Sequence, residues 1–242
     1  MTLDIRKALC AVSVALLWSL PAGADGSTPA GTPNWSGSFL ARLEALALLQ
    51  TLNADLLSND SATLTLEHWC ELHRLASPPR IVAERVPGTD KLPSPEQRRE
   101  LGVTPTEPVR YRRVRLLCGA VVLSEADNWY VPGRLTPEMN RQLDATDTPF
   151  GKVVQALQFR RRTLSSTVLW RPLPEGWEMN VTADKDAAPL SPMPQKVLEH
   201  RALLSLPDGT PFSEVIEFYT ANVLAFPVPL PCRRGRDGFD DC

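Results

Sequence analysis

One acidic residue near the C-terminal end of the chain falls among large apolar side chains. The stretch FSEVIEFYT, residues 212–220, alternates like a half-buried β-strand, which places Glu214 on the face of its phenylalanine and isoleucine side chains. Burying an unpaired carboxylate is costly, so Glu214 needs a cation, a hydrogen-bond donor or an opening to solvent. A salt bridge to Arg201 or a solvent-facing edge strand would satisfy it structurally. In a pocket, its apolar neighbours would favour the protonated acid, which suits proton transfer or a hydrogen bond to a hydroxyl.

Two further features could bind an anion. Arg113 and Arg115 share one face of a predicted strand, which is ordinarily solvated. In a pocket, however, a guanidinium would grip a carboxylate through two N–H groups. The sequence TPFG, residues 148–151, predicts a helix start whose free backbone N–H groups accept anions, and Gly151 allows close approach there. These features are compatible with a small carboxylate ligand.

Several classes of function are disfavoured by the sequence. The net charge is -2, so no global basic balance points to nucleic acid. The three histidines, His68, His73 and His200, lack the grouping of metal ligands, and no two cysteines have CxxC spacing. Neither G-x-S-x-G nor a glycine-rich phosphate loop occurs. We therefore expect no cofactor, no metal and no nucleic-acid partner.

The first 24 residues have the layout of a signal peptide. Arg6 and Lys7 precede an apolar run over residues 8–20, and the small residues 22–24 follow. This pattern predicts cleavage before Asp25 and a periplasmic or secreted protein. The run is shorter than the roughly 20 residues that span a bilayer, so we expect no stable membrane insertion after cleavage. An uncleaved anchor remains an alternative, as does a misassigned start codon, which would leave the protein in the cytoplasm.

Cleavage would leave four cysteines, Cys70, Cys118, Cys232 and Cys242, which allow three disulfide pairings in an exported protein. Pairing Cys232 with Cys242 would staple the polar tail that they bracket. Cys70 and Cys118 lie in periodic apolar stretches, where a buried free thiol is the commoner state. The sequence therefore favours free thiols at Cys70 and Cys118.

The mature chain predicts an α+β fold, with helices packed on a mainly antiparallel sheet. Residues 25–37 are rich in Gly, Pro, Ser and Thr and predict a flexible lead, and residues 38–242 predict a single domain. Apolar residues at helical spacing predict one helix over residues 39–56 and a second from about Thr65 to before Pro78.

Alternation and turn signals predict the remaining elements. Strands are expected over residues 80–86, 109–118, 121–131, 157–170, 200–206 and 212–220. A polar connector is expected over residues 87–108, short helices are expected to begin at Thr136-Pro137 and Thr148-Pro149, and strand fragments with a loop are expected over residues 175–194. On the strand over residues 109–118, alternation places Val114, Leu116 and Cys118 on one face.

Two of the predicted hairpins resemble each other. Ser124-Glu125 followed by Trp129-Tyr130 matches Ser213-Glu214 followed by Phe218-Tyr219 without a gap. We interpret this match as an internal duplication of one β-hairpin.

Three segments, in this order over about residues 64–226, resemble the chorismate lyase family, whose fold is shared with the effector-sensing domains of GntR-type transcription regulators. The segments are RVRLLCGAVVLSEADNWYVP, LTPEMNRQLDATDTPFGKVV and RALLSLPDGTPFSEVIEFY. The resemblance implies a chorismate lyase-like domain. It also implies a cofactor-free lyase that converts chorismate to 4-hydroxybenzoate and pyruvate.

The resemblance also implies roles for single residues. Arg113, three residues before Leu116 of LLCG, matches the family's carboxylate-binding arginine, and Glu214 matches its acid, which faces the ring hydroxyl and assists loss of the enolpyruvyl group. Phe150, in the TPFG turn with Gly151, matches a position that contributes a backbone N–H. Arg113 and Glu214 are thus the expected catalytic pair, and Phe150 and Gly151 complete the expected substrate site.

Because this fold also serves ligand sensors, a second hypothesis is an exported, non-catalytic module that binds a small aromatic or carboxylic ligand. A third is a structural envelope protein in which the hairpins only pack. In each case a monomer is expected.

Overall fold

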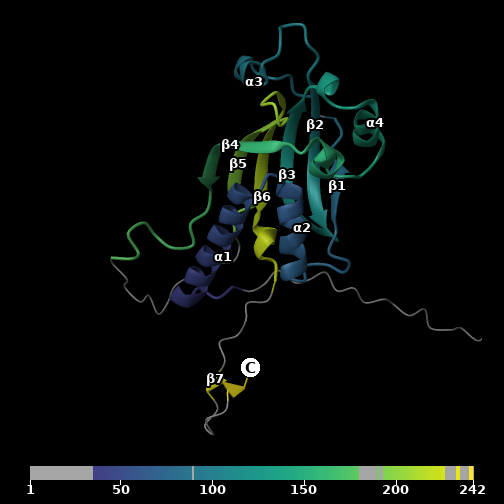
Figure 1. Cartoon of the computed structure of the whole chain (residues 1–242). Helices are drawn as coiled ribbons and strands as arrows, with labels where there is room; N and C mark the ends of the chain where they lie inside the picture. Colours follow the sequence, from purple (N-terminus) through teal and green to yellow (C-terminus); the bar gives the residue numbers. More distant parts are fainter. Residues whose placement is uncertain are drawn as a thin grey trace, which may run out of the picture. The chain divides into compact units, whose positions relative to one another are not determined.

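A six-stranded antiparallel sheet forms the centre of the protein in a computed structural model, which describes residues 35–88, 90–179, 190, 193–226, 233–234 and 240–241 (Figure 1). The strand order is β1-β2-β3-β6-β5-β4. The strands are β1 (Ile81–Arg85), β2 (Arg110–Cys118), β3 (Val121–Tyr130), β4 (Arg160–Val168), β5 (Lys196–Ser205) and β6 (Pro211–Thr220). Two short strands, β7 (Arg233–Arg234) and β8 (Asp240–Asp241), pair with each other. The predicted α+β class with a mainly antiparallel sheet is confirmed.

The α-helices are α1 (Phe39–Ser58), α2 (Ala62–Leu72), α3 (Pro95–Glu100), α4 (Pro137–Ala145) and α5 (Phe150–Val153). The described residues also form three 3-10 turns, η1 (Pro132–Arg134), η2 (Gln155–Leu157) and η3 (Ala221–Leu224). Figure 1 shows α1 and α2 over the same face of the sheet. None of the helices in the described part of the chain has the length and apolar character that a membrane span requires.

Local capping explains where three helices differ from the prediction. α2 begins at Ala62, earlier than expected, because the Ser61 side chain caps it by accepting from the Leu64 N–H. α3 lies inside the predicted connector, where Ser94 and Gln97 form a capping box. The predicted polar connector over residues 87–108 thus contains a short helix that was not predicted. At α5, proline occupies the cap position and the first helical residue is Phe150.

The sheet consists of two three-stranded meanders, β1-β2-β3 and β4-β5-β6, joined where β3 pairs with β6. In that pairing Ser124 lies opposite Tyr219, and Tyr130 lies opposite Ser213. These four residues are the ends of the two matching phrases in the sequence. The two similar hairpins therefore meet in a locally two-fold symmetric arrangement, which agrees with the predicted duplication.

A large apolar core fills the space between α1, α2 and the sheet. Leu49, Leu52 and Leu56 of α1 are fully buried in it. Trp35, at the end of the predicted lead, is also fully buried and its indole N–H donates to the Leu224 carbonyl at 3.2 Å. The predicted signal peptide, residues 1–24, lies outside the described residues.

A disulfide bond between Cys70 and Cys118 joins α2 to β2, with 6.1 Å between the two Cα atoms. The prediction of free thiols at these positions was wrong. Alternation places Cys118 on the core face of β2, and the helical period places Cys70 on the buried side of α2, so both side chains enter one interface. The proposed pair of Cys232 and Cys242 lies outside the described residues.

Replacing Cys70 and Cys118 together by alanine is expected to lower the free energy of unfolding by roughly 4 kcal/mol, because the unfolded chain loses a cross-link between residues 48 apart. Denaturant titration of the oxidised wild type and the variant measures the difference. The Cys232→Ala/Cys242→Ala variant, which keeps this bond, is the matched control. Equal midpoints and slopes for the wild type and the Cys70/Cys118 variant would contradict the expectation.

Candidate functional site

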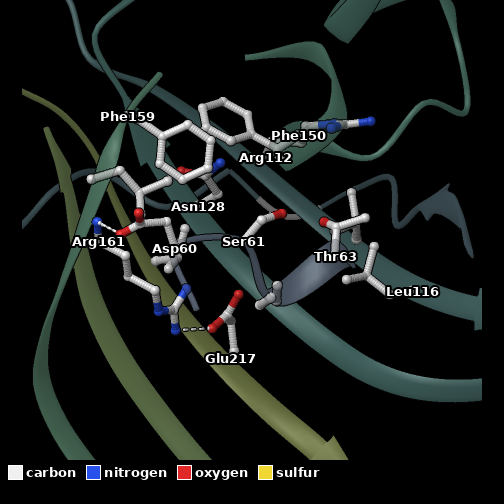
Figure 2. A pocket seen from close by; sticks show the side chains of 16 residues that line it. Asp60, Ser61, Thr63, Arg112, Leu116, Asn128, Phe150, Phe159, Arg161 and Glu217 are labelled. Carbon is white, nitrogen blue, oxygen red and sulfur yellow. Dashed lines mark hydrogen bonds and ion pairs between the residues drawn. The ribbon is translucent and has the colours of Figure 1, made fainter. Parts of the chain in front are cut away.

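A cavity lies between the sheet and the starts of α2 and α5 (Figure 2). It contains about 520 Å³ of space that protein atoms do not fill, part of it open to solvent. Its polar lining residues are Asp60, Ser61, Thr63, Arg112, Asn128, Arg161 and Glu217. Its apolar lining includes Val114, Leu116, Phe150, Phe159, Leu204 and Val215. Such a mixed lining suits a small ligand with one apolar and one polar end.

Arg112 is the unusual residue of the cavity. It is only 5% exposed, yet its Nε and Nη1 atoms have no hydrogen-bond partner among the described residues. Within the part of the chain that the structure describes, its side chain makes one hydrogen bond, from Nη2 to the Thr148 carbonyl at 3.4 Å. Burial, with repulsion from Arg85, lowers the pKa of Arg112 to about 10, so the side chain stays cationic at neutral pH. A buried cation without a carboxylate costs several kcal/mol, and an anion would offset that cost.

The second arginine of the cavity, Arg161, has a carboxylate partner, while its Nε, like that of Arg112, has no hydrogen-bond partner among the described residues. Nη2 of Arg161 donates to Oε2 of Glu217 at 2.5 Å, and the Tyr219 hydroxyl donates to the same oxygen at 3.0 Å. Burial opposes the charge of Arg161, but Glu217 outweighs it and raises the pKa of the guanidinium. The Arg161 backbone N–H also donates to Asp60 at 2.8 Å. Figure 2 shows both contacts of Arg161, which connect β4 to β6 and to Asp60, two residues before the start of α2.

Gly151 allows α5 to approach α2 closely. A Cβ atom at this position would lie 3.0 Å from the hydroxyl oxygens of both Ser61 and Thr63. Phe150 next to it stacks on Phe212 with 6.3 Å between ring centroids. The TPFG sequence thus closes the cavity by close backbone packing on one side and by an aromatic ring on the other.

The four residues predicted for the site are not brought together. Phe150 and Gly151 line the cavity. Arg113 and Glu214 lie on the other face of the sheet, because they alternate with Arg112 and with Val215, which line it. Their predicted catalytic and substrate-binding roles therefore stay predictions, and they concern a different face from the cavity.

Arg113 and Glu214 each have a charged partner of their own. Arg113 approaches Glu125 at 3.5 Å and Asp127 at 3.9 Å. Glu214 is fully buried and accepts from Nε of Arg201 at 2.7 Å, which is the salt bridge that the sequence suggested as its structural role. By the strand register, the Cα atoms of Arg113 and Glu214 are two strand spacings and two residues apart, which corresponds to a distance of roughly 12 Å.

Four lining residues that sequence reasoning missed are Arg112, Asn128, Arg161 and Glu217. A signal existed for Arg112, since alternation puts it on the face of Val114, Leu116 and Cys118. That argument is the same as the one that singled out Glu214. For Glu217 no comparable signal existed, because the residues on both faces of its strand are largely apolar.

A buried histidine borders the ion pair. His200 lies opposite Glu217 in the sheet, and its Nε2 lies 2.8 Å from the amide oxygen of Asn53, which fixes the proton on Nε2. Its Nδ1 has no partner among the described residues. Burial lowers the pKa of His200 to about 4, a direction that the nearby Arg161 reinforces and Glu217 opposes. The ring is thus held neutral in the folded protein.

Comparison with known proteins gives a family but no activity. No family model matches the chain. A protein of Sinorhizobium fredii named uncharacterized protein y4mC is 58% identical over 198 residues, which cover 81% of this chain and 83% of that protein. The chain therefore belongs to the same family as y4mC.

Among solved structures, the similar ones include domains of transcription regulators. PhnF from Mycobacterium smegmatis has a TM-score of 0.41 and 12% identity, and 64% of each chain is covered. A GntR-family regulator from Enterococcus faecalis has a TM-score of 0.37 and 13% identity, with 62% of this chain and 99% of that chain covered. At these identities and TM-scores the likeness says nothing about a ligand of this chain.

The pH dependence of stability should reflect His200. Between pH 6.5 and about 4 the unfolded chain binds a proton at this histidine and the folded chain does not, so stability present above pH 6.5 is lost as the pH falls. The loss amounts to at most about 3 kcal/mol. In urea titrations at pH 7 and pH 4.5, the His200→Gln variant should show a smaller fall than the wild type. The exposed His68→Gln variant should match the wild type, and an identical fall in all three proteins would contradict the assignment.

Proposed function

We propose that the chain binds a small organic anion, in which a carboxylate is joined to an aromatic or other apolar group. The observation that carries the proposal is Arg112, a buried cation with two N–H groups that no described residue accepts. The other buried arginine of the cavity, Arg161, already has a carboxylate partner. The charge in the cavity that no described carboxylate neutralises is therefore positive.

The apolar lining of the cavity suits the apolar part of such a ligand. Phe150 and Phe159 form one wall, and Leu204 and Val215 belong to the sheet opposite. Figure 2 shows the two rings on one side of the cavity and the Arg161–Glu217 pair on the other. A flat ring between these walls buries apolar area, while its carboxylate reaches Arg112, so affinity and orientation come from different groups.

Calorimetric titration with 4-hydroxybenzoate tests the proposal on three proteins. The wild type should bind, and Arg112→Gln should weaken binding at least about 30-fold, because it removes one partner of a buried charge pair. Arg113→Gln changes the adjacent arginine on the opposite face, which is already paired with Glu125, and should weaken binding by no more than about fivefold, the upper range for a partly exposed charge. A weaker Arg113→Gln with an unchanged Arg112→Gln would contradict the proposal and favour the site expected from the sequence resemblance.

Turnover is the second candidate function, since Arg112 shares the cavity with a carboxylate, Glu217. The reaction would be the elimination of pyruvate from chorismate to give 4-hydroxybenzoate. Glu217 accepts from Arg161 and Tyr219, so it is better placed to accept a hydrogen bond from a ring hydroxyl than to donate a proton. The same three proteins, incubated with chorismate, decide between the candidates. Product from the wild type supports lyase activity, and its absence at high protein concentration leaves the binding function.

Export is part of the proposal. The bond between Cys70 and Cys118 suits an oxidising compartment such as the periplasm, because cytosolic thiols are kept reduced. The layout of residues 1–24 points in the same direction. Intact mass of the protein from the periplasmic fraction should correspond to a mature N-terminus near Asp25. A full-length mass in the cytosolic fraction would contradict export.

A further inference from the structure

Outside the cavity, on the other side of Arg112, lies an open cleft along the ends of β1 and β2. Two overlapping parts of it contain about 820 and 1000 Å³ of empty space, including solvent. Five cationic residues line it, namely Arg85, Lys91, Arg110, Arg112 and Arg113. The acidic residues in its lining are Asp90 and Asp144. Arg112 belongs both to this cleft and to the inner cavity.

Three of the five cations have carboxylate partners. Lys91 pairs with Asp127 at 2.6 Å, and Arg110 pairs with Asp144 at 3.1 Å. Arg113 approaches Glu125 at 3.5 Å. The remaining two, Arg85 and Arg112, have no carboxylate within 4.0 Å in the described part of the chain. The positive charge of the cleft is therefore concentrated on this pair.

Arg85 and Arg112 are near neighbours on the same face of the sheet. Arg85 lies opposite Val114 in the β1–β2 register, so Arg112 is its diagonal neighbour, at roughly 7–8 Å between Cα atoms. Nη1 of Arg85 donates to the main-chain carbonyl of Asp144 at 2.7 Å, which orients the side chain without neutralising it. The two guanidiniums repel each other, as the lowered pKa of Arg112 reflects after the larger effect of burial. Two like charges held side by side favour an anion between them.

We propose that Arg85 is the second cation of the anion site, and that the cleft is the entrance by which the ligand reaches Arg112. The acid group of the ligand then stays at the mouth, between Arg85 and Arg112, while the apolar part lies in the inner cavity. The position of the apolar part rests on the proposed function; the anion site at the mouth does not.

The arrangement assigns different tasks to the two arginines. Arg112 is buried, so its contact with the acid group is screened little and holds the bound ligand. Arg85 is exposed, so its charge acts chiefly on the approach of the ligand, and salt should weaken its effect. The class of ligand that fits is one with its acid group at one end and its ring at the other.

Sulfate tests the anion site without any organic ligand. Low millimolar sulfate should raise the melting temperature of the wild type, and Arg85→Gln should lose most of that shift. The matched control is Arg162→Gln. It changes an exposed arginine of β4 that is paired with Glu100, and it should keep the shift. Sulfate also stabilises proteins non-specifically, so only the difference between the variants counts. Equal shifts in all three proteins would overturn the proposal.

Stopped-flow binding of 4-hydroxybenzoate tests the entrance. Arg85→Gln should slow association by about fivefold at low salt, the upper range for an exposed charge, and the difference should shrink at high salt. Dissociation should change less than association. Association at the wild-type rate in Arg85→Gln would overturn the proposal that the cleft is the entrance. If 4-hydroxybenzoate fails to bind the wild type but the sulfate difference is present, the proposed function fails and the anion site stands.

Discussion

The antiparallel pairing of β3 with β6 is the constraint on which the site depends. It joins the two meanders so that Arg112 and Asn128 of the first face the same cavity as Arg161 and Glu217 of the second. A shift of one residue in this register would move every side chain of β6 to the other face and exchange Glu217 for its neighbours. The local two-fold symmetry of the hairpins thus also shapes the cavity, because it brings the equivalent positions Asn128 and Glu217 of the two repeats into its lining.

The two buried arginines of the cavity differ in how their charge is satisfied. Arg161 is neutralised by Glu217, so its role is structural, and it connects β4 to β6 across the sheet. Arg112 has only a long contact to a main-chain carbonyl. A protein selected for stability alone would not retain a buried cation in that state. The difference between two otherwise similar residues is what separates the functional interpretation of the cavity from an incompletely packed core.

Alternation along the strands allowed the α+β class, six of the strand positions and the shared face of Val114, Leu116 and Cys118 to be predicted. It could not tell which face of β6 borders the cavity, because FSEVIEFYT carries apolar residues on both faces and both are largely buried. Glu217 was therefore not predicted to line the cavity, and the role predicted for Glu214 on the other face stays a prediction. The Cys70–Cys118 bond could not be predicted from the sequence either, since it depends on how α2 packs on β2. The α3 capping box, in contrast, is a local pattern of Ser94 and Gln97, so the start of this helix could have been predicted from the sequence.

The disulfide bond has a consequence for how the walls of the cavity are held. Of the two helices that border it, α2 is attached covalently to the strand that carries Arg112. The other, α5, is a single turn without a side-chain cap, and a partly exposed ion pair between Lys152 and Glu67 connects it to α2. The wall of the cavity that α2 and β2 form is therefore held by a covalent bond, whereas the wall that carries the Phe150 ring is held by packing and by this ion pair.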